Sequence, residues 1–392
     1  MDMEAFWAQR WRGLWFATAL GFVFSANYTN HGPMVPTLVQ DLHITLTLGG
    51  LLTTAIFLSH GALQIPGGAL ADRLGAKKVA FWALIIITVG NLIIGFCNSY
   101  YPILVLKFII GIGTGMAFIA GARYVATFFA GKEIQRAQGV YGGSIVLGSG
   151  FVIYGVPQLL GAVGWHNVFM ITGGMAGILG VLWFFFAPDI PNDVTSPKIN
   201  WSSVLGNANI WLLCGAQLGS FGVIISAGVW VNTLLIQSIH LDPKTAGMVG
   251  SIVLLAGIIS RPLGGLLLGK QMLSTKPLLI LSCLGLALGF LWIGVSNTLS
   301  MALIGIIFTG IMAGLPFAGI FNSARDNCPA TPGAAMGLVN TWGAVGVMAL
   351  PPIIGRLVDI SGNFLSSFCL LAGVSLFGAV CCLVLRPPRP VC

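Results

Sequence analysis

The fold is decided by residues 57–78, which read Phe57-Leu-Ser-His-Gly-Ala-Leu-Gln-Ile-Pro-Gly-Gly-Ala-Leu-Ala-Asp-Arg-Leu-Gly-Ala-Lys-Lys78. An apolar, helix-like stretch runs into the pair Gly67-Gly68, and a short charged loop follows it. A related stretch reads Gly257-Ile-Ile-Ser-Arg-Pro-Leu-Gly-Gly-Leu-Leu-Leu-Gly-Lys270, and its glycine pair lies 197 residues after the first one. Because this offset is close to half of the 392 residues, the chain is predicted to contain two copies of one unit.

Other glycines repeat at nearly the same offset. Gly111 and Gly115 precede Gly310 and Gly314 by 199 residues, and Gly139 and Gly148 precede Gly337 and Gly346 by 198. Three helix pairs with nearly the same offset indicate duplicated halves in parallel topology. In such folds the substrate site lies near the bilayer midplane between the halves, and rocking of one half on the other gives alternating access.

The composition indicates a polytopic membrane protein. Hydrophobic residues make up 56% of the chain and charged residues 7%, whereas soluble domains contain about 25% charged residues. Apolar runs recur that are long enough to cross the bilayer as helices. The prediction is an all-α membrane protein with twelve transmembrane helices in two six-helix pseudo-repeats. The predicted spans are 14–37, 48–70, 78–97, 102–127, 137–161, 167–187, 208–237, 246–268, 276–296, 300–323, 334–355 and 364–385.

The polar stretch from Pro188 to Asn207 divides the predicted spans into two sets. We therefore expect an N-terminal six-helix bundle at 1–187, a cytoplasmic linker at 188–207 and a C-terminal six-helix bundle at 208–392. With the N-terminus in the cytoplasm, twelve Lys and Arg residues fall inside and two, Lys244 and Arg356, fall outside. This bias predicts a multi-pass protein of the cell (inner) membrane with both termini cytoplasmic.

The net charge of +8 does not indicate a nucleic-acid partner, because the cations lie in short loops and no basic tract contains interleaved aromatic residues. The eight cysteines show no metal-ligand spacing and are expected to be packing residues. No nucleophile motif and no Walker pattern are present, so we expect no enzyme activity, no cofactor and no bound metal. The polar start of the chain leads directly into the first span, which is expected to be an uncleaved anchor.

The charged loop after the first glycine pair, Gly68-x-x-x-Asp72-Arg73-x-Gly75-x-Lys77-Lys78, resembles the signature of the major facilitator superfamily. The resemblance covers essentially the whole chain and implies a transporter. It implies that Asp72, Arg73 and Lys77, in the loop with Gly68 and Gly75, form a cytoplasmic charge latch that favours the outward-facing state. The second copy has Gly269 and Lys270 at the places of Asp72 and Arg73, so the latch is expected on one side only. Lys77 and Lys78 could alternatively act only as topology determinants.

A second motif, Lys107-x-x-x-Gly111-x-Gly113, resembles the Arg-x-x-Gln-Gly-x-Gly motif that the family links to proton coupling. The resemblance makes Lys107 a coupling candidate, although lysine replaces arginine and Ile110 replaces glutamine. The alternative is that Lys107, near the outer end of its predicted span, extends to the interface.

Arg261 is the main candidate for substrate binding. An arginine just past the centre of a span is costly unless it faces a cavity, an anion or a partner, and its planar fork binds carboxylates and oxyanions in a bidentate way. Ser260-Arg261-Pro262-x-Gly264 is similar to the pattern of nitrate/nitrite, oxalate and monocarboxylate carriers of the superfamily, whose arginine at this place binds the anion. The alternatives are an arginine that extends to the cytoplasm or binds carbonyls freed by Pro262.

Gln64 occupies the matching place in the second span, where nitrate carriers have a second arginine. This departure suggests a substrate with one main anionic group. His60 lies one turn before Gln64, and Asn27 and His31 are four residues apart in the first span, so these polar groups are expected to line the cavity. His60 is also a coupling candidate because histidine titrates near neutral pH, although a packing role remains open.

Three further side chains complete the expected substrate site. Arg123 could bind an anion or extend to the interface, and Tyr154 and Asn322 could donate hydrogen bonds.

All ten Asp and Glu residues lie at or near loops and helix ends, so the chain lacks the buried carboxylate that proton pumps and cation exporters usually need.

The predicted function is secondary active transport by alternating access of a small organic or inorganic anion, by proton symport or anion exchange. The alternative is export of neutral or amphipathic organic compounds, with Arg261 in a structural role. A sensor on a transporter fold is disfavoured, because the chain contains no long extension for a partner. The expected partners are the small-molecule anion and the lipid bilayer, with no nucleic acid, and the expected state is a monomer.

Overall fold

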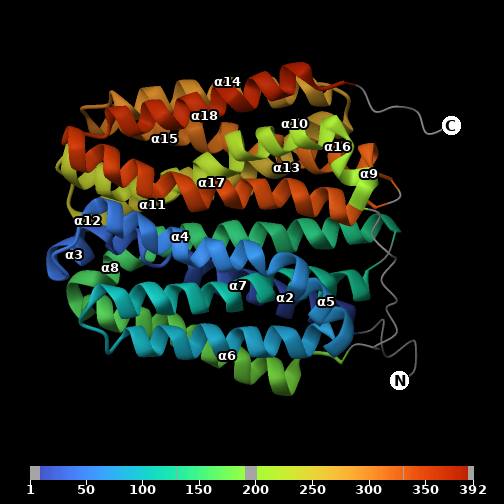
Figure 1. Cartoon of the computed structure of the whole chain (residues 1–392), viewed down its shortest axis with the longest axis horizontal. Helices are drawn as coiled ribbons and strands as arrows, with labels where there is room; N and C mark the ends of the chain where they lie inside the picture. The colour runs from blue at the N-terminus through green and yellow to red at the C-terminus, as the bar shows by residue number, and fades with distance from the viewer. Residues whose placement is uncertain (1–8, 130, 190–200, 330, 387–392) are drawn as a thin grey trace. The chain divides into compact units, whose positions relative to one another are not determined.

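The computed structural model describes residues 9–129, 131–189, 201–329 and 331–386. In these ranges every regular element is a helix and no strand occurs (Figure 1). Most of the predicted linker, residues 190–200, lies outside the described residues. An all-helical structure is the expected result for spans that must satisfy every backbone polar group inside a bilayer.

The chain divides into two compact units. The first comprises Met1–Ile44 and Ala55–Ser196, and the second comprises Thr45–Thr54 and Pro197–Cys392. The division therefore follows the two sequence copies except at Thr45–Thr54, a segment of the first copy that groups with the second unit.

The described residues of the first unit form eight helical elements, one of which is shared with the second unit. They are α2 (Arg10–Thr29), η1 (Gly32–Met34), α3 (Val35–Asp41), α4 (Leu46–Ala62), α5 (Gln64–Leu74), α6 (Ala76–Ile94), α7 (Tyr100–Phe128) and α8 (Gly131–Phe186). Helix α8 contains the predicted fifth and sixth spans, and the backbone at Gly164 between them is non-helical, with φ 73° and ψ 162°. Glycine adopts this positive φ without the clash that a Cβ atom causes.

Eleven further elements lie in the part of the second unit that the structure describes. They are α9 (Trp201–Leu205), α10 (Ala208–Gln217), η2 (Leu218–Gly222), α11 (Val223–Ser238), α12 (Pro243–Leu255), α13 (Gly257–Gly269), α14 (Thr275–Gly294), α15 (Leu299–Gly314), α16 (Pro316–Asn327), α17 (Pro332–Ser361) and α18 (Leu365–Val384). Helices α14 and α18 lie side by side (Figure 1). The described residues hold nine helices long and apolar enough to cross a membrane, and α4 is a shorter apolar helix.

Several predicted spans are interrupted rather than continuous. The first helix ends at Thr29, before Gly32 and Pro33, so the predicted span 14–37 is not one helix. Breaks also separate α4 from α5, α12 from α13 and α15 from α16, and η2 is a π-helical turn between α10 and α11. Pro66 and Pro316 lie just after two of the breaks, and proline removes the backbone donor that would bond the carbonyl four residues earlier. Broken helices and π-turns are frequent at functional sites.

The glycines that repeat in the sequence lie where helices approach closely. A Cβ atom at Gly111 of α7 would collide with Ser59 Oγ and the Ile56 carbonyl of α4. At the matching Gly310 of α15, a Cβ atom would lie 2.9 Å from the Val253 carbonyl of α12. Both units therefore use a small residue at the equivalent helix contact, as close packing of membrane helices requires.

Candidate functional site

His60 lies near the end of α4 inside a cluster of aromatic rings. Its side chain is buried, and Nδ1 lies 3.0 Å from Thr114 Oγ1 of α7. The Thr114 hydroxyl also donates to the Gly111 carbonyl at 3.1 Å, so it connects the imidazole to the backbone of α7. The rings around the imidazole, at centroid distances of 5.5–6.4 Å, belong to Phe24, Tyr28, Phe57 and Phe118.

Gln64 is buried at the start of α5. The interruption at Leu63 lies between it and His60. The expectation that His60 lies one turn before Gln64 assumed a continuous helix, and the four-residue spacing does not determine the relative orientation of the two side chains across the break.

A buried polar network surrounds Lys107 of α7. Lys107 is fully buried, its Nζ donates to Asn30 Oδ1 at 2.5 Å, and it lies 4.7 Å from the centroid of the Phe169 ring. The amide of Asn30 donates in turn to Asn91 Oδ1 at 3.1 Å and to Thr172 Oγ1 at 2.9 Å. The alternative that Lys107 extends to the interface is therefore wrong, because Asn30 and Phe169 hold the ammonium group inside the unit.

Asn27 and His31 adjoin this network. Both are fully buried, so neither lines an open cavity in this conformation. Asn27 Nδ2 donates to the carbonyls of Val23 and Thr172, while its Oδ1 has no hydrogen-bond partner among the described residues. His31 follows the end of α2 and is not part of a continuous helix with Asn27.

The Lys107 network predicts a non-additive effect on stability. We expect Asn30→Ala to lower the free energy of unfolding by about 3 kcal/mol, because it leaves a buried ammonium group without its amide acceptor. Lys107→Met removes that charge, so the double variant Asn30→Ala/Lys107→Met should be more stable than Asn30→Ala alone. Thermal unfolding of the four proteins of this cycle measures the coupling, and strictly additive losses would contradict it.

Arg261 lies in α13, the second part of a broken helix. The centre of its guanidinium group is 4.4 Å from the centroid of the Phe317 ring, and the side chain is half-buried. Phe317 is the second residue of α16, directly after the break at Leu315. Ser260 Oγ donates to the Gly310 carbonyl at 3.3 Å, which ties α13 to α15. A cation over an aromatic ring is attracted by the negative face of the ring, so Phe317 favours the charged guanidinium group at this place.

The other expected substrate residues differ in how exposed they are. Arg123 is half-buried in α7, Tyr154 of α8 is 42% exposed, and Asn322 of α16 is exposed. The structure brings none of the three into the His60 cluster or the Lys107 network as these are described above, so their binding roles stay predictions.

The predicted charged loop is mostly helical, because Asp72 and Arg73 lie in α5, Lys77 lies in α6 and Gly75 alone separates the two helices, and Lys77 has a partner that the sequence analysis missed. Lys77 Nζ lies 2.8 Å from Asp189 Oδ1, just after α8. Arg73 is exposed, and Gly75 has φ 87°, a conformation that favours glycine between two helices. Gly68 lies within α5, and the side chain of Asp72 lies outside the described part of the structure. The latch of Asp72, Arg73 and Lys77 therefore stays a prediction, with Asp189 as an additional carboxylate at Lys77.

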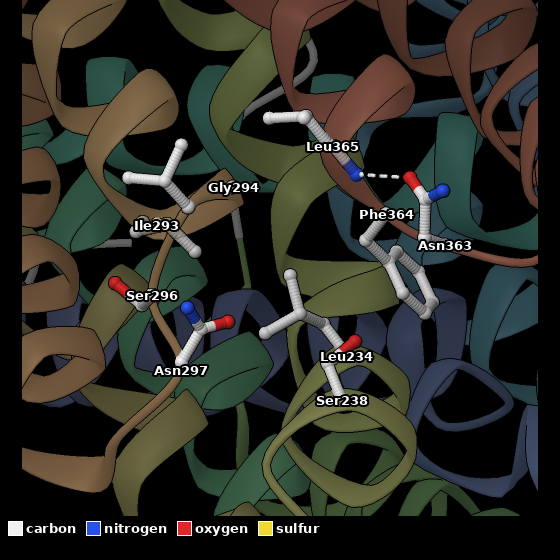
Figure 2. A pocket seen from close by; sticks show the side chains of 10 residues that line it. Leu234, Ser238, Ile293, Gly294, Ser296, Asn297, Asn363, Phe364 and Leu365 are labelled. Carbon is white, nitrogen blue, oxygen red and sulfur yellow. Dashed lines mark hydrogen bonds between the residues drawn. The ribbon is translucent and has the colours of Figure 1, made fainter.

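A surface cavity of about 410 Å³ lies in the second unit at the ends of α11, α14 and α18 (Figure 2). Its polar lining comes from Ser238, Ser296, Asn297 and Asn363, and Leu234 points into it. It contains no charged lining residue and none of the expected site residues. This cavity offers hydrogen bonds but no counter-charge for an anion, and it is distinct from Arg261.

Sequence reasoning missed several of the contacting residues. Asn30, Asn91 and Thr172 form the Lys107 network, Thr114 contacts His60, and Phe317 stacks on Arg261. The polar ones carried a usable signal, since an uncharged polar residue inside an apolar span usually finds a partner on another helix. Phe317 carried no such signal among the 24 phenylalanines of the chain.

The helical fold, the apolar spans and the buried polar groups define a multi-pass membrane transporter. The sequence profile of the Major Facilitator Superfamily matches residues 17–346 and 232–391, and the chain belongs to this family. The expected resemblance is thereby confirmed.

Individual relatives are distant. "Probable nitrate transporter NarT" of Staphylococcus epidermidis is 26% identical over 350 residues, which cover 89% of this chain and 88% of the relative. "Probable sulfoacetate transporter SauU" of Cupriavidus necator is 24% identical over 394 residues, covering 93% and 91%. "Nitrite extrusion protein" of Bacillus subtilis is 22% identical over 344 residues, covering 88% and 86%.

Among solved structures, the fold is similar to that of a bacterial homologue of the human lysosomal transporter Spinster in an inward-facing and occupied conformation. The TM-score is 0.77 at 15% sequence identity, and the alignment covers 95% of this chain and 96% of the other. At this identity the likeness supports the fold alone.

Proposed function

We propose that the protein is a secondary transporter of a small anion and that Arg261 binds the anion. The observation that carries the proposal is the stacking of Arg261 on Phe317 beside two broken helices of the second unit. A cation held in this way within a membrane helix suits an anionic ligand, because its charge is costly in hydrocarbon and its fork matches two coplanar oxygen atoms. The named substrates of the relatives, nitrate, nitrite and sulfoacetate, are anions of this kind.

The finer features of the function belong to the same proposal. Gln64, His60, Asn27, His31, Arg123, Tyr154 and Asn322 are the further candidates for the anion path. Coupling is by proton symport or by anion exchange, with His60 and Lys107 as the candidate coupling groups. The protein acts as a monomer in the lipid bilayer of the cell (inner) membrane, with its termini and the 188–207 linker in the cytoplasm.

Thermal unfolding of the purified protein tests the anion proposal. A ligand that binds only the folded state raises stability by RT ln(1 + [L]/Kd), about 2.7 kcal/mol at a hundred times Kd. We expect nitrate, nitrite or a short carboxylate to stabilise the wild type and Arg325→Ala, and to leave Arg261→Ala unchanged. Arg325 is a matched control because it lies in the same unit and pairs with the adjacent Asp326 at 3.0 Å.

The opposite pattern would favour the alternative function. If anions have no effect while neutral amphipathic compounds stabilise the wild type and Arg261→Ala equally, Arg261 is structural. Export of neutral or amphipathic compounds would then be the better description.

A further inference from the structure

Two pairs of residues with the same unusual backbone conformation show which connections of the two copies correspond. His43 and His240 have φ 51° and 59° and lie 197 residues apart, and Gly164 and Gly362 have φ 73° and 69° and lie 198 residues apart. A positive φ is uncommon, above all for residues other than glycine. The connection after α3 therefore corresponds to that after α11, and the bend within α8 corresponds to the connection between α17 and α18.

In the first unit these connections meet at two aromatic rings. Trp165 is buried, and its Nε1 donates to Asp41 Oδ2 at 2.9 Å. The ring of His166 stacks on that of Trp165 at a centroid distance of 3.5 Å, and His166 Nε2 lies 3.2 Å from Asn98 Oδ1. The end of α3, the connection between α6 and α7 and the bend of α8 are thus joined through an indole and an imidazole.

The counterparts of these four residues all line the cavity of about 410 Å³ in the second unit (Figure 2). At the offsets of 197, 199 and 198 residues, they are Ser238 for Asp41, Asn297 for Asn98, Asn363 for Trp165 and Phe364 for His166. The indole of the first copy is replaced by a short amide, so the second unit has open space where the first unit has a ring.

Two of the polar lining residues are engaged with the backbone. Asn363 Oδ1 accepts from the Leu365 amide at 3.1 Å and its Nδ2 donates to the Ser361 carbonyl at 3.2 Å, so this amide caps the start of α18 (Figure 2). The Ser296 hydroxyl donates to the Trp292 carbonyl at 2.7 Å. These two side chains shape the cavity rather than offer their polar groups to it.

Ser238 and Asn297 differ from their first-copy counterparts in what they face. Asp41 and Asn98 each contact a ring nitrogen, whereas the second copy has Asn363 and Phe364 at the positions of those two rings, and neither supplies a ring N–H. The remaining wall is apolar, with the buried side chains of Leu234 and Ile293. Apolar walls with a few hydrogen-bonding groups, at this volume, are typical of small-molecule sites.

We propose that this cavity binds a neutral heteroaromatic molecule whose ring carries an N–H group and a second nitrogen. Ser238 Oγ accepts from the N–H, as Asp41 does from Trp165 in the first unit, and the Asn297 amide donates to the second nitrogen. The ring packs against Leu234 and Phe364. A charged molecule is disfavoured, because no lining residue supplies a counter-charge for the hydration that it loses.

Fluorine NMR of a fluorinated benzimidazole tests the site, at slightly alkaline pH where this heterocycle is neutral. The purified full chain is titrated in lipid nanodiscs, and empty nanodiscs measure partition into lipid. We expect saturable binding by the wild type, and about tenfold weaker binding by Asn297→Leu and by Ser238→Ala, since each loses one hydrogen bond. Asn98→Leu, which removes the matching amide of the first unit, is the matched control and should bind like the wild type.

Restoring the first-copy residues gives an independent test. The double variant Asn363→Trp/Phe364→His places an indole and an imidazole in the cavity and should abolish binding. Leu234→Trp, which fills the cavity from α11, serves if the double variant cannot be purified. Thermal unfolding of each variant shows that it is folded.

The proposal would be overturned if the wild type took up no more heterocycle than empty nanodiscs, or if binding were the same in the wild type, Asn297→Leu and the filled variant. Equal binding of fluoronaphthalene, which has no nitrogen, would overturn it as well. If mass spectrometry instead found a phospholipid retained by the wild type and lost from the filled variant, the cavity would be a lipid site. Because no anion is used, failure of this site and failure of the proposed substrate class are distinguishable.

Discussion

Arg261→Ala is expected to reduce uptake of the anion that stabilises the wild type by about a hundredfold in proteoliposomes. The guanidinium fork would donate two charge-assisted hydrogen bonds to the anion, and their loss corresponds to about 3 kcal/mol. Arg261→Lys keeps the charge but not the planar fork, so we expect an intermediate loss of about tenfold. Initial rates of labelled nitrate, nitrite or acetate uptake measure both effects.

The Phe317 contact provides a graded control for this result. Phe317→Leu removes the ring that lies 4.4 Å from the guanidinium centre, and a cation–π contact contributes about 0.5–2 kcal/mol. Its effect on uptake should therefore be smaller than that of Arg261→Ala. Equal uptake by the wild type and Arg261→Ala, at equal protein levels, would exclude Arg261 as the anion ligand.

Gly111→Ala is expected to lower stability by about 3 kcal/mol or to prevent accumulation of the folded protein. The added methyl group would meet Ser59 Oγ and the backbone carbonyl of Ile56, and a helix backbone cannot move aside as a flexible side chain can. Thermal unfolding and the monodisperse yield after purification measure the effect.

Gly174→Ala is the matched control for this packing prediction. Gly174 also lies within a long helix, but nothing lies within 4 Å of a Cβ atom built there. Alanine has the higher helix propensity, so this variant should be neutral or slightly more stable. If both alanine variants behaved alike, close approach of α4 and α7 would not be the reason for glycine at position 111.

The fold was predictable because it follows from patterns that the bilayer imposes. Two helical halves were predicted from the apolar runs, the polar break near the middle of the chain and the glycines that repeat at nearly the same offset. The structure explains this repeat, because Gly111 and Gly310 lie at equivalent close contacts between helices. The helix breaks were less predictable. Proline explains two of them only after the structure shows which prolines lie just after a break, since membrane helices also contain proline without a break.

The site was only partly predictable, because hydropathy marks an unusual residue but not its partner. Lys107, His60 and Arg261 were recognisable as polar groups in apolar spans. Their contacts with Asn30, Thr114 and Phe317 join helices far apart in the sequence, and one sequence contains no information on such pairs. The sequence left two alternatives for Lys107, a buried coupling group and a side chain that extends to the membrane interface. The hydrogen bond to Asn30 excludes the second alternative, because it holds the ammonium group inside the unit.

The burial of Lys107 has a consequence for biosynthesis. A charged lysine inside an isolated membrane helix is costly, so α7 gains from a partner that is already in the membrane. Asn30 and Asn91 precede Lys107 in the chain and are synthesised before it, whereas Phe169 and Thr172 are synthesised after it. Domains assemble from the N-terminus as the chain emerges. The amide of Asn30 can thus receive the ammonium group as soon as α7 leaves the ribosome, and α8 then closes the network around a pair that has already formed.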